Sequence, residues 1–467
     1  MDEKQKATQL SDISRFAEPV PLDESTWHLW VNTEQARESL IVRRLIEQLR
    51  QARERAEPVK ILFAGHSGSG KSTELFRVKR EIDHLYHVVI KRIGDRYSLP
   101  SVDYRQLLFF CASVFVEVGM QLNAVIKDKD EAQQVLAWFD EVRREEVQSG
   151  GHQIAAEAGA KMSLFSSLFA KFSGKIYSGG ETKETAVKYI ESRLDQLRLN
   201  MRLLVRAIEE KLNGRKLLLI LEDLDKIEDR DQSTRLFFEH RLQLLDIPCP
   251  VIFTFPIALW YEQDASVQSY PIRHLLPMIP VSPPPAAAAA QEAARKKADI
   301  GRDTLRRLLF QRIEESAELI TPEAVDYLIH FSGGVLRDFL YLLREAAIGA
   351  MVRDHGQIAL DDVKTVARLL RSEYANRISP PQRPFGETTI TLDDINQTLG
   401  EVTDWPKRTA DRPAAFRMLL QSLCILEYNG EQWFNLHPAV REYLEIRHAE
   451  REARKTKKAT TPRSRKR

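Results

Sequence analysis

The residues of this chain best suited to chemistry are a glycine-rich run that ends in a lysine and a hydroxyl. Residues 65–72 read GHSGSGKS and fit the phosphate-loop pattern G-x-x-x-x-G-K-[ST]. The apolar run 59–64 precedes this loop, and apolar residues at helical spacing follow it from Leu75 to Ile82. A glycine-rich turn without a ligand would not require this order of strand, loop and helix. The sequence therefore predicts a nucleotide site.

Each part of this loop has an expected role toward ATP and Mg²⁺, the two predicted cofactors. Its three glycines let successive N–H groups point at phosphate oxygens, and the helix that starts near Lys71 adds its positive dipole end. Lys71 is expected to reach the β- and γ-phosphates, and the Ser72 hydroxyl is expected to bind Mg²⁺. The predicted cofactor-binding residues are Gly65, His66, Ser67, Gly68, Ser69, Gly70, Lys71, Ser72 and Thr73.

A second group of chemical residues follows the aliphatic run 217–221. Such a run is typical of a buried parallel strand, which delivers Glu222, Asp223 and Asp225 at its carboxyl end. We predict Glu222 in the Mg²⁺ shell with Ser72, and Asp223 as the group that activates water. The alternative register gives the metal to Asp223 and the water to Asp225. An acidic helix cap without chemistry is the third interpretation.

At these residues the chain resembles the AAA+ and STAND-type phosphate-loop ATPases, most closely the branch that includes the origin-recognition initiators. In that branch an aliphatic strand ends in D-[DE]-x-D and a helical lid carries G-G/D-x-x-R; here the positions read EDLD at 222–225 and GGVLR at 333–337. The resemblance covers roughly residues 30–446. It departs at Glu222, where the family usually has aspartate for Mg²⁺.

The resemblance implies three further site residues. Arg337 corresponds to the sensor-2 arginine, which contacts the γ-phosphate from the lid, and Thr254 to the polar sensor-1 residue at a strand end. Arg273, after that strand, is a weak candidate for the arginine finger that acts on a neighbouring subunit. An arginine fork suits phosphate and would let ATP draw two domains together.

The wider pattern predicts an α/β fold, a parallel sheet of the phosphate-loop NTPase type with a long helical insertion, a helical lid and a C-terminal winged helix. Further strands are expected at 86–93, 251–255 and 275–281, and a buried helix at 104–120. The predicted domains are a helical lead-in (1–57), the core (58–281) with its insertion (127–214), a linker (282–300), the lid (301–380), a winged-helix-like domain (381–446) and a basic disordered tail (447–467).

The insertion carries two amphipathic patterns. Apolar residues at steps of three and four from Val187 to Leu212 predict a long helix that ends at Gly214. Residues 162–172 place phenylalanine and leucine on one helical face beside lysines. That stripe fits a buried or partner-binding helix better than a membrane-surface helix.

The predicted winged helix depends on a hairpin signal. Asn429-Gly430 lies between two short apolar runs within 425–434, with helical patterns at 414–422 and 439–446. The helix 414–422 is expected to expose Arg417 and Gln421 and little else. Groove-reading helices usually present more polar side chains, so sequence-specific DNA binding ranks low.

Composition limits the class of protein. The chain has 467 residues, of which 43% are hydrophobic and 29% charged, and three scattered cysteines, with no long apolar run and no signal-peptide pattern at its start. We expect a cytoplasmic protein with no membrane span. Residues 451–467 hold nine Lys or Arg and one Glu, although the whole chain is only +2. This tail is either a solvated end or a nonspecific DNA-binding segment.

Three functions follow from these patterns. The first is an ATPase that drives a conformational switch in a homo-oligomer and controls a partner or effector protein; the resemblance implies a regulatory or antiviral-defence role. The second is a DNA-associated loader of the initiator type. The third is a nucleotide-binding scaffold with little turnover.

Overall fold

The computed structural model describes residues 6–124, 191, 194–262, 270–283, 291–382, 384–385, 388–402, 413–428 and 433–460. Most of the predicted insertion, including the stripe 162–172, lies outside these residues, as do 284–290 of the predicted linker and 461–467 of the predicted tail.

A five-stranded parallel sheet forms the centre of the predicted core. Its strands are β1 (Lys60–Gly65), β2 (Tyr86–Arg92), β3 (Lys216–Glu222), β4 (Val251–Phe255) and β5 (Ile272–Leu276), in the order β2-β3-β4-β1-β5. All four pairings are parallel, which confirms the predicted α/β fold. The fifth strand lies three residues before the predicted start. Buried and partly exposed residues alternate along this edge strand, so it contains no continuous apolar run that would indicate its start. Pro277 follows its last residue.

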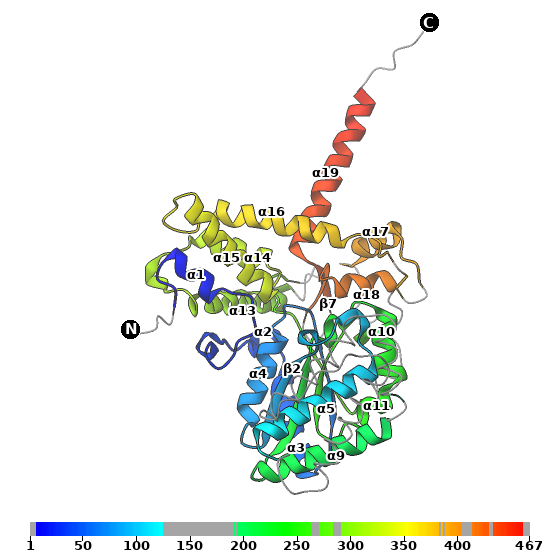
Figure 1. Cartoon of the computed structure of the whole chain (residues 1–467). Coiled ribbons are helices and arrows are strands. Elements are labelled where there is room, and N and C mark those ends of the chain that lie inside the picture. The colour runs from blue at the N-terminus through cyan, green and yellow to red at the C-terminus, as the bar shows by residue number, and fades with distance from the viewer. Residues whose placement is uncertain are drawn as a thin grey trace, which may run out of the picture.

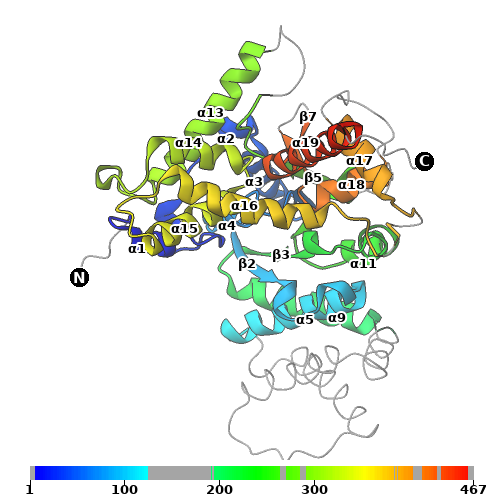
Figure 2. The ribbon, with the colours of Figure 1, turned by 90° about the horizontal axis from the view of Figure 1, so that it is seen from above.

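Alternate residues of the strands pack on two helical layers. Ile61 and Phe63 of β1 face α3 (Ile41–Glu54) and α4 (Lys71–Ile82). Leu62 and Ala64 face the cluster that contains α5 (Tyr104–Gln121) and α9 (Leu194–Lys211). Both faces of the sheet are therefore covered, and Figure 2 shows α5 and α9 together on one side. Because helices cover both faces, the carboxyl edge of the sheet is the expected place for a ligand.

Short elements complete the core and the N-terminal region. They are α1 (Leu10–Phe16), η1 (Trp27–Leu29), α2 (Glu34–Arg37), η2 (Ile93–Asp95), η3 (Leu99–Ser101), η4 (Leu224–Lys226), α10 (Arg230–Thr234), the π-helical turn η5 (Arg235–Glu239), α11 (Arg241–Leu245) and α12 (Ile257–Trp260).

The lid is helical, as predicted. It consists of α13 (Gln291–Phe310), η8 (Glu315–Ala317), α14 (Pro322–Phe331), α15 (Leu336–Val352) and α16 (Leu360–Arg377). The Thr321 side chain accepts from the Ala324 N–H and caps α14, with Pro322 in its first turn. The predicted linker 282–300 is wrong from residue 291 onward, because α13 begins there. Its alanines and long charged side chains favour a helix.

The C-terminal region contains the predicted hairpin. Strands β6 (Ile425–Tyr428) and β7 (Trp433–Leu436) pair antiparallel. Helices α17 (Leu392–Glu401) and α18 (Ala414–Gln421) precede them in the chain, and α19 (Pro438–Thr460) follows. The expectation of disorder from residue 447 is wrong as far as Thr460, because α19 continues through 447–460. This stretch is rich in Ala, Glu, Lys and Arg and contains neither Gly nor Pro. Figure 1 shows α19 projecting from the body.

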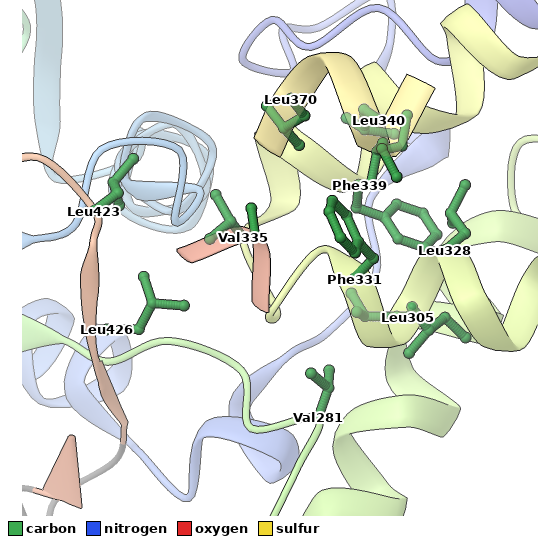
Figure 3. Close-up of a cluster of buried hydrophobic side chains, with 14 of the residues drawn as sticks. Val281, Leu305, Leu328, Phe331, Val335, Phe339, Leu340, Leu370, Leu423 and Leu426 are labelled. Atoms are coloured by element: carbon green, nitrogen blue, oxygen red, sulfur yellow. The ribbon is translucent and has the colours of Figure 1, made fainter. Parts of the chain in front are cut away.

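One apolar cluster joins the lid to the C-terminal hairpin and to α1. In the view of Figure 3, Val335 at the start of α15 lies between Leu423 and Leu426 on one side and Phe331 and Phe339 on the other. Lid and hairpin thus share a core that lies above the carboxyl edge of the sheet. Across the described ranges, no helix combines the length and apolar character needed to cross a bilayer.

Candidate functional site

The phosphate loop lies where the sequence predicts it, between β1 and α4 at the carboxyl edge of the sheet. Gly68 and Gly70 have φ values of 76° and 94°, which side chains with a Cβ rarely adopt. A Cβ on Gly68 would also lie 2.9 Å from the Cβ of Arg337. Glycine at position 68 therefore permits both the turn of the loop and the approach of the lid.

Lys71 is buried under the loop and bound on several sides. Its Nζ donates to the carbonyl oxygens of Gly65 and His66 at 2.8 and 2.9 Å. It also forms an ion pair with Asp225 Oδ2 at 2.8 Å. The Lys71 charge holds the pKa of the Asp225 carboxyl below its usual value, although burial acts in the opposite direction. The structure thus brings the predicted loop lysine and a predicted strand-end carboxylate together.

Glu222 ends β3 beside the first turn of α4. Burial raises the pKa of its carboxyl, while the Ser72 hydroxyl and the Arg92 guanidinium oppose that rise. Arg92 Nε lies 3.4 Å from Glu222 Oε2, whereas the buried Oε1 has no well-formed hydrogen bond within the described residues. An unsatisfied carboxylate oxygen beside a serine hydroxyl fits Mg²⁺, which commonly takes one or two carboxylates and completes its shell with phosphate oxygens and water.

Asp223 has a different environment from its two acidic neighbours. Its backbone is left-handed, with φ of 73°, and its Oδ1 pairs with Lys226 Nζ at 2.6 Å. Its Oδ2 lies 2.9 Å from the position that a Cβ on Gly94 would take, in η2 after β2. Aspartate tolerates this backbone conformation better than most residues. Both Asp223 and Asp225 line the cavity at the loop, so the two predicted registers remain open.

Thr254 lies on β4, between the strands that carry the loop and the acidic residues. Its hydroxyl accepts from the Asp225 N–H at 3.4 Å, and it lines the same cavity. Thr254 is the second-last residue of β4, and its role as sensor 1 stays a prediction.

Arg337 reaches the loop from the lid. Its Nη1 donates to Ser67 Oγ at 3.1 Å, and its backbone N–H donates to the Gly68 carbonyl at 3.2 Å. The lid arginine that the sequence singles out is therefore in contact with the phosphate loop. Arg273, in contrast, is exposed on β5 with its guanidinium 6.0 Å from the Trp260 ring centre, and it is outside this cavity.

The N-terminal lead-in supplies site residues that the sequence analysis missed. Residues 19–22 and 29–31 line the cavity together with Leu308 and Leu340 of the lid. The Leu22 N–H donates to Thr73 Oγ1 at 3.3 Å, so Thr73 holds this segment against α4. The proline and aliphatic side chains of residues 19–22 form no motif, so their spacing does not indicate that they line a cavity.

The sequence analysis also missed Arg37, a buried residue that donates a hydrogen bond to the loop. It is 2% exposed, and it donates to Thr33 Oγ1 at 2.9 Å, to the Ser69 carbonyl at 2.5 Å and to the Pro277 carbonyl. Burial lowers its pKa to about 10, so it stays charged at neutral pH. This arginine ties the N-terminal region to the loop and to the chain that follows β5.

The predicted loop residues divide into two sets. Those that line the cavity are Ser67, Gly68, Gly70, Lys71, Ser72 and Thr73. Gly65, His66 and Ser69 lie outside that lining. The fully buried His66 ring points toward the C-terminal hairpin, where its Nε2 accepts from the Glu427 N–H at 2.8 Å.

Helix α18 differs from expectation. Arg417 and Gln421, which were expected to be exposed, contact the core instead: Arg417 Nε lies 3.7 Å from Glu262, and Gln421 Nε2 donates to the Asp225 carbonyl at 2.9 Å. Both partners lie far away in the chain, so a helical projection could not reveal this contact.

Comparisons with known proteins give only distant structural similarities. No sequence-family model matches the chain, and no curated protein matches it in sequence. The Holliday-junction branch-migration motor RuvB of Thermotoga maritima is 12% identical, covering 92% of this chain and 98% of that one, with a TM-score of 0.33. The ORC1 protein of Aeropyrum pernix, solved in complex with DNA, is 15% identical, covering 90% and 96%, with a TM-score of 0.37. Drosophila ORC bound to DNA is 13% identical, covering 91% and 94%, with a TM-score of 0.33. At these TM-scores the likeness is too weak to support a functional argument.

Proposed function

We propose that this chain is a Mg²⁺-dependent ATPase of the AAA+/STAND kind, in which ATP binding and hydrolysis drive a conformational and oligomeric switch that controls a partner protein. The observation that carries the proposal is that residues from β3 and from the lid contact the phosphate loop and the start of α4 together. Lys71 pairs with Asp225 from β3, Ser72 lies beside Glu222, and Arg337 of the lid contacts Ser67 and Gly68. These are the groups that phosphoryl transfer requires for positioning and charge stabilisation.

The roles follow from the positions. Lys71 would exchange its contact with Asp225 for the β- and γ-phosphates, and Ser72 and Glu222 would hold Mg²⁺. When bound, the metal neutralises charge that develops on the transferred phosphoryl group. Asp223 would orient or deprotonate the attacking water, and Thr254 would fix the Asp225 backbone. Arg337 would stabilise the γ-phosphate from the lid.

The base end of the nucleotide would lie between the N-terminal segment and the lid. Residues 19–22 supply one apolar wall, and Leu308 and Leu340 supply another. ATP would thereby contact three regions that are far apart in the sequence. A ligand that touches all three can shift the balance between their arrangements, which is the physical basis of the proposed switch. Arg273, exposed on the edge strand β5, stays the candidate finger toward a neighbouring subunit of a homo-oligomer.

The proposal is tested first at Lys71. We expect Lys71→Ala to weaken ATP binding about tenfold to hundredfold, since it removes charge-assisted hydrogen bonds to phosphate. Thermal shift with Mg-ATP, together with phosphate release, measures binding and turnover. Lys79→Ala, on the same helix with its ammonium over Phe76, is the control and should behave as wild type. Equal ATP-induced stabilisation of wild type and Lys71→Ala would show that nucleotide does not bind at this loop.

Two alternative functions are each favoured by a specific observation. A scaffold with little turnover is favoured by Glu222 in place of the usual aspartate and by its contact with Arg92. A DNA-associated loader is favoured by the basic end of α19. The contact of α18 with the core argues against groove reading by that helix in this conformation, because Arg417 and Gln421 are engaged. Turnover measured alone and with DNA separates these alternatives.

A further inference from the structure

The C-terminal unit, defined here as residues 414–436 where described, rests on the carboxyl edge of the sheet. It contacts the segments that follow four strands. Hydrogen bonds join it to His66 after β1, Asp225 after β3, Ala258 after β4 and Met278 after β5. The segments after β1 and β3 also line the cavity beside the phosphate loop.

Glu427 of β6 makes two of these contacts through its backbone. Its N–H donates to His66 Nε2 at 2.8 Å, and its carbonyl accepts from the Met278 N–H at 3.1 Å. Met278 and Tyr428 also form a parallel bridge. The hairpin is thereby fixed to the sheet edge by one main-chain bond to Met278 and by one bond to the His66 ring.

Gln421, the last residue of α18, contacts the chemical part of the site. Its side-chain amide donates to the Asp225 carbonyl at 2.9 Å, and its Oε1 accepts from the Ala258 N–H at 3.4 Å. The two ends of one amide thus join the turn after β3 to the turn after β4. The turn after β3 also contacts β4 itself, where the Asp225 N–H donates to the Thr254 hydroxyl.

Asp225 is consequently held at three points. Lys71 binds its carboxylate at 2.8 Å, Thr254 accepts from its N–H, and Gln421 binds its carbonyl. Two of these groups belong to the phosphate-loop core, and the third comes from a helix nearly two hundred residues further along the chain. Small displacements in a catalytic constellation cost large factors in rate, so a bond that fixes this turn affects chemistry.

We propose that Gln421 is a positioning residue of the ATPase site: it sets the turn that carries Asp223 and Asp225 against the end of β4, so the C-terminal unit must be docked for hydrolysis at full rate. This inference rests on the proposed ATPase function. It assigns α18 to the core and not to a nucleic-acid groove. Arg417, which lies 3.7 Å from Glu262 one turn earlier, holds the same face of α18 against the core.

Two variants of similar size separate the two bonds of Gln421. Gln421→Met removes both, whereas Gln421→Glu keeps an acceptor for Ala258 and loses the donor to Asp225. Ser422→Ala is the matched control, because the Ser422 hydroxyl donates to Leu419 within the same helix. All three are made in the full chain, and thermal melting establishes that each is folded. If Gln421→Met does not fold, Gln421→Glu decides.

The first readout is amide hydrogen exchange without nucleotide, which is independent of turnover. We expect about fivefold faster exchange over residues 223–227 in both Gln421 variants, and faster exchange at Ala258 only in Gln421→Met. The second readout is steady-state hydrolysis, with kcat reduced about tenfold and the affinity for Mg-ATP changed less than about twofold. A residue that only stabilised the fold would not produce this split.

The outcomes are distinguishable. Unchanged exchange over 223–227 in the Gln421 variants, or wild-type kcat in both, overturns the role of Gln421. A matched loss in Ser422→Ala also overturns it, since any change in α18 would then suffice. If wild type binds Mg-ATP and releases no phosphate, the proposed ATPase function fails, while the exchange measurement still decides whether Gln421 fixes this turn.

Discussion

At the scale of single residues, the site is organised around one buried lysine. Lys71 is 6% exposed, and its charge is satisfied by Asp225 and by two loop carbonyls. A buried ammonium without such partners would be strongly unfavourable. Phosphate oxygens can take over the role of Asp225, so binding of nucleotide would release that carboxylate. The lysine and the acidic turn are therefore coupled through this ion pair.

The first prediction at this scale concerns the acidic register. Asp223→Asn should keep Mg-ATP binding and lose about 10²- to 10⁴-fold in kcat, because an amide cannot act as a base. Glu222→Gln should mainly weaken Mg²⁺ binding and so raise the Mg²⁺ concentration needed for half-maximal turnover. Phosphate release at several Mg²⁺ concentrations measures both. If Asp223→Asn hydrolyses ATP at the wild-type rate while Asp225→Asn does not, Asp225 is the residue that activates the water. If only Glu222→Gln is inactive, Glu222 is that residue.

The second prediction concerns Arg337. Arg337 contacts Ser67 of the loop, and the proposed function assigns it to the γ-phosphate. Arg337→Ala should therefore lower ATP affinity about tenfold and ADP affinity by much less, since only ATP offers that contact. Calorimetry with both nucleotides measures the difference. Arg344→Ala, on the same helix but paired with Glu345, is the control. Matched losses for ATP and ADP would assign Arg337 a structural role.

At the scale of elements, the contact between the loop and the hairpin depends on a neutral histidine. His66 Nε2 accepts from the Glu427 N–H, which requires that this nitrogen carry no proton. Burial lowers the pKa of His66 to about 3, from an ordinary value of 6.5, and the nearby Lys71 charge adds to this effect. The loop, β6 and the lid that shares its core thus meet at a group that tolerates no charge.

A pH dependence follows from this shift. Between pH 6.5 and 3 the unfolded chain binds a proton at His66 that the folded protein does not bind. The free energy of unfolding should therefore fall with falling pH in this window, by up to about 1.4 kcal/mol per pH unit from this group. His66→Gln retains an acceptor that does not titrate and should flatten the dependence, measured by urea unfolding from pH 7 to 4.5.

The control for this measurement is His84→Gln, at an exposed position after α4. It should leave the pH dependence as in wild type. An equal decline of stability with pH in wild type and His66→Gln would mean that the loop–hairpin contact does not depend on the His66 charge.

At the scale of the whole molecule, a basic C-terminal segment lies apart in the sequence from the residues of the candidate nucleotide site. Residues 451–467 carry +8, which leaves the rest of the chain net acidic. The described part of this segment continues α19, which extends away from the lid and the core in Figure 1. A basic segment on a projecting helix can approach the phosphate backbone of a nucleic acid without involving the sheet edge.

Any nucleic-acid affinity should accordingly be nonspecific and reside in this segment. We expect deletion of 451–467 to abolish binding of duplex DNA while ATP-induced stabilisation persists. Fluorescence anisotropy between 50 and 200 mM salt should show that the affinity of the full chain for DNA falls steeply as salt rises. The physical reason is that binding releases counterions from the DNA phosphates. A truncated protein that still bound DNA with sequence preference would move the DNA-associated loader ahead of the partner switch.

The sequence by itself determined the features that depend on local chemistry. The order of strand, loop and helix around Lys71, the buried strand before Glu222, the cap at Thr321 and the hairpin after α18 each leave a short pattern in neighbouring residues. Backbone geometry and burial impose these patterns directly. The same reasoning misplaced β5 and ended α19 too early, because half-buried strands and solvated helices carry weaker patterns.

Only the tertiary structure decided which distant residues complete the site. Arg37 binds a carbonyl of the loop, residues 19–22 line the cavity beside it, and Gln421 binds the turn after β3 through its side-chain amide. None of these contacts requires a particular sequence spacing. The apolar cluster shared by the lid and the hairpin places α18 on the carboxyl edge of the sheet, and this turns two residues of an expected surface face toward the core. Long-range packing fixes such contacts, and no local periodicity encodes them.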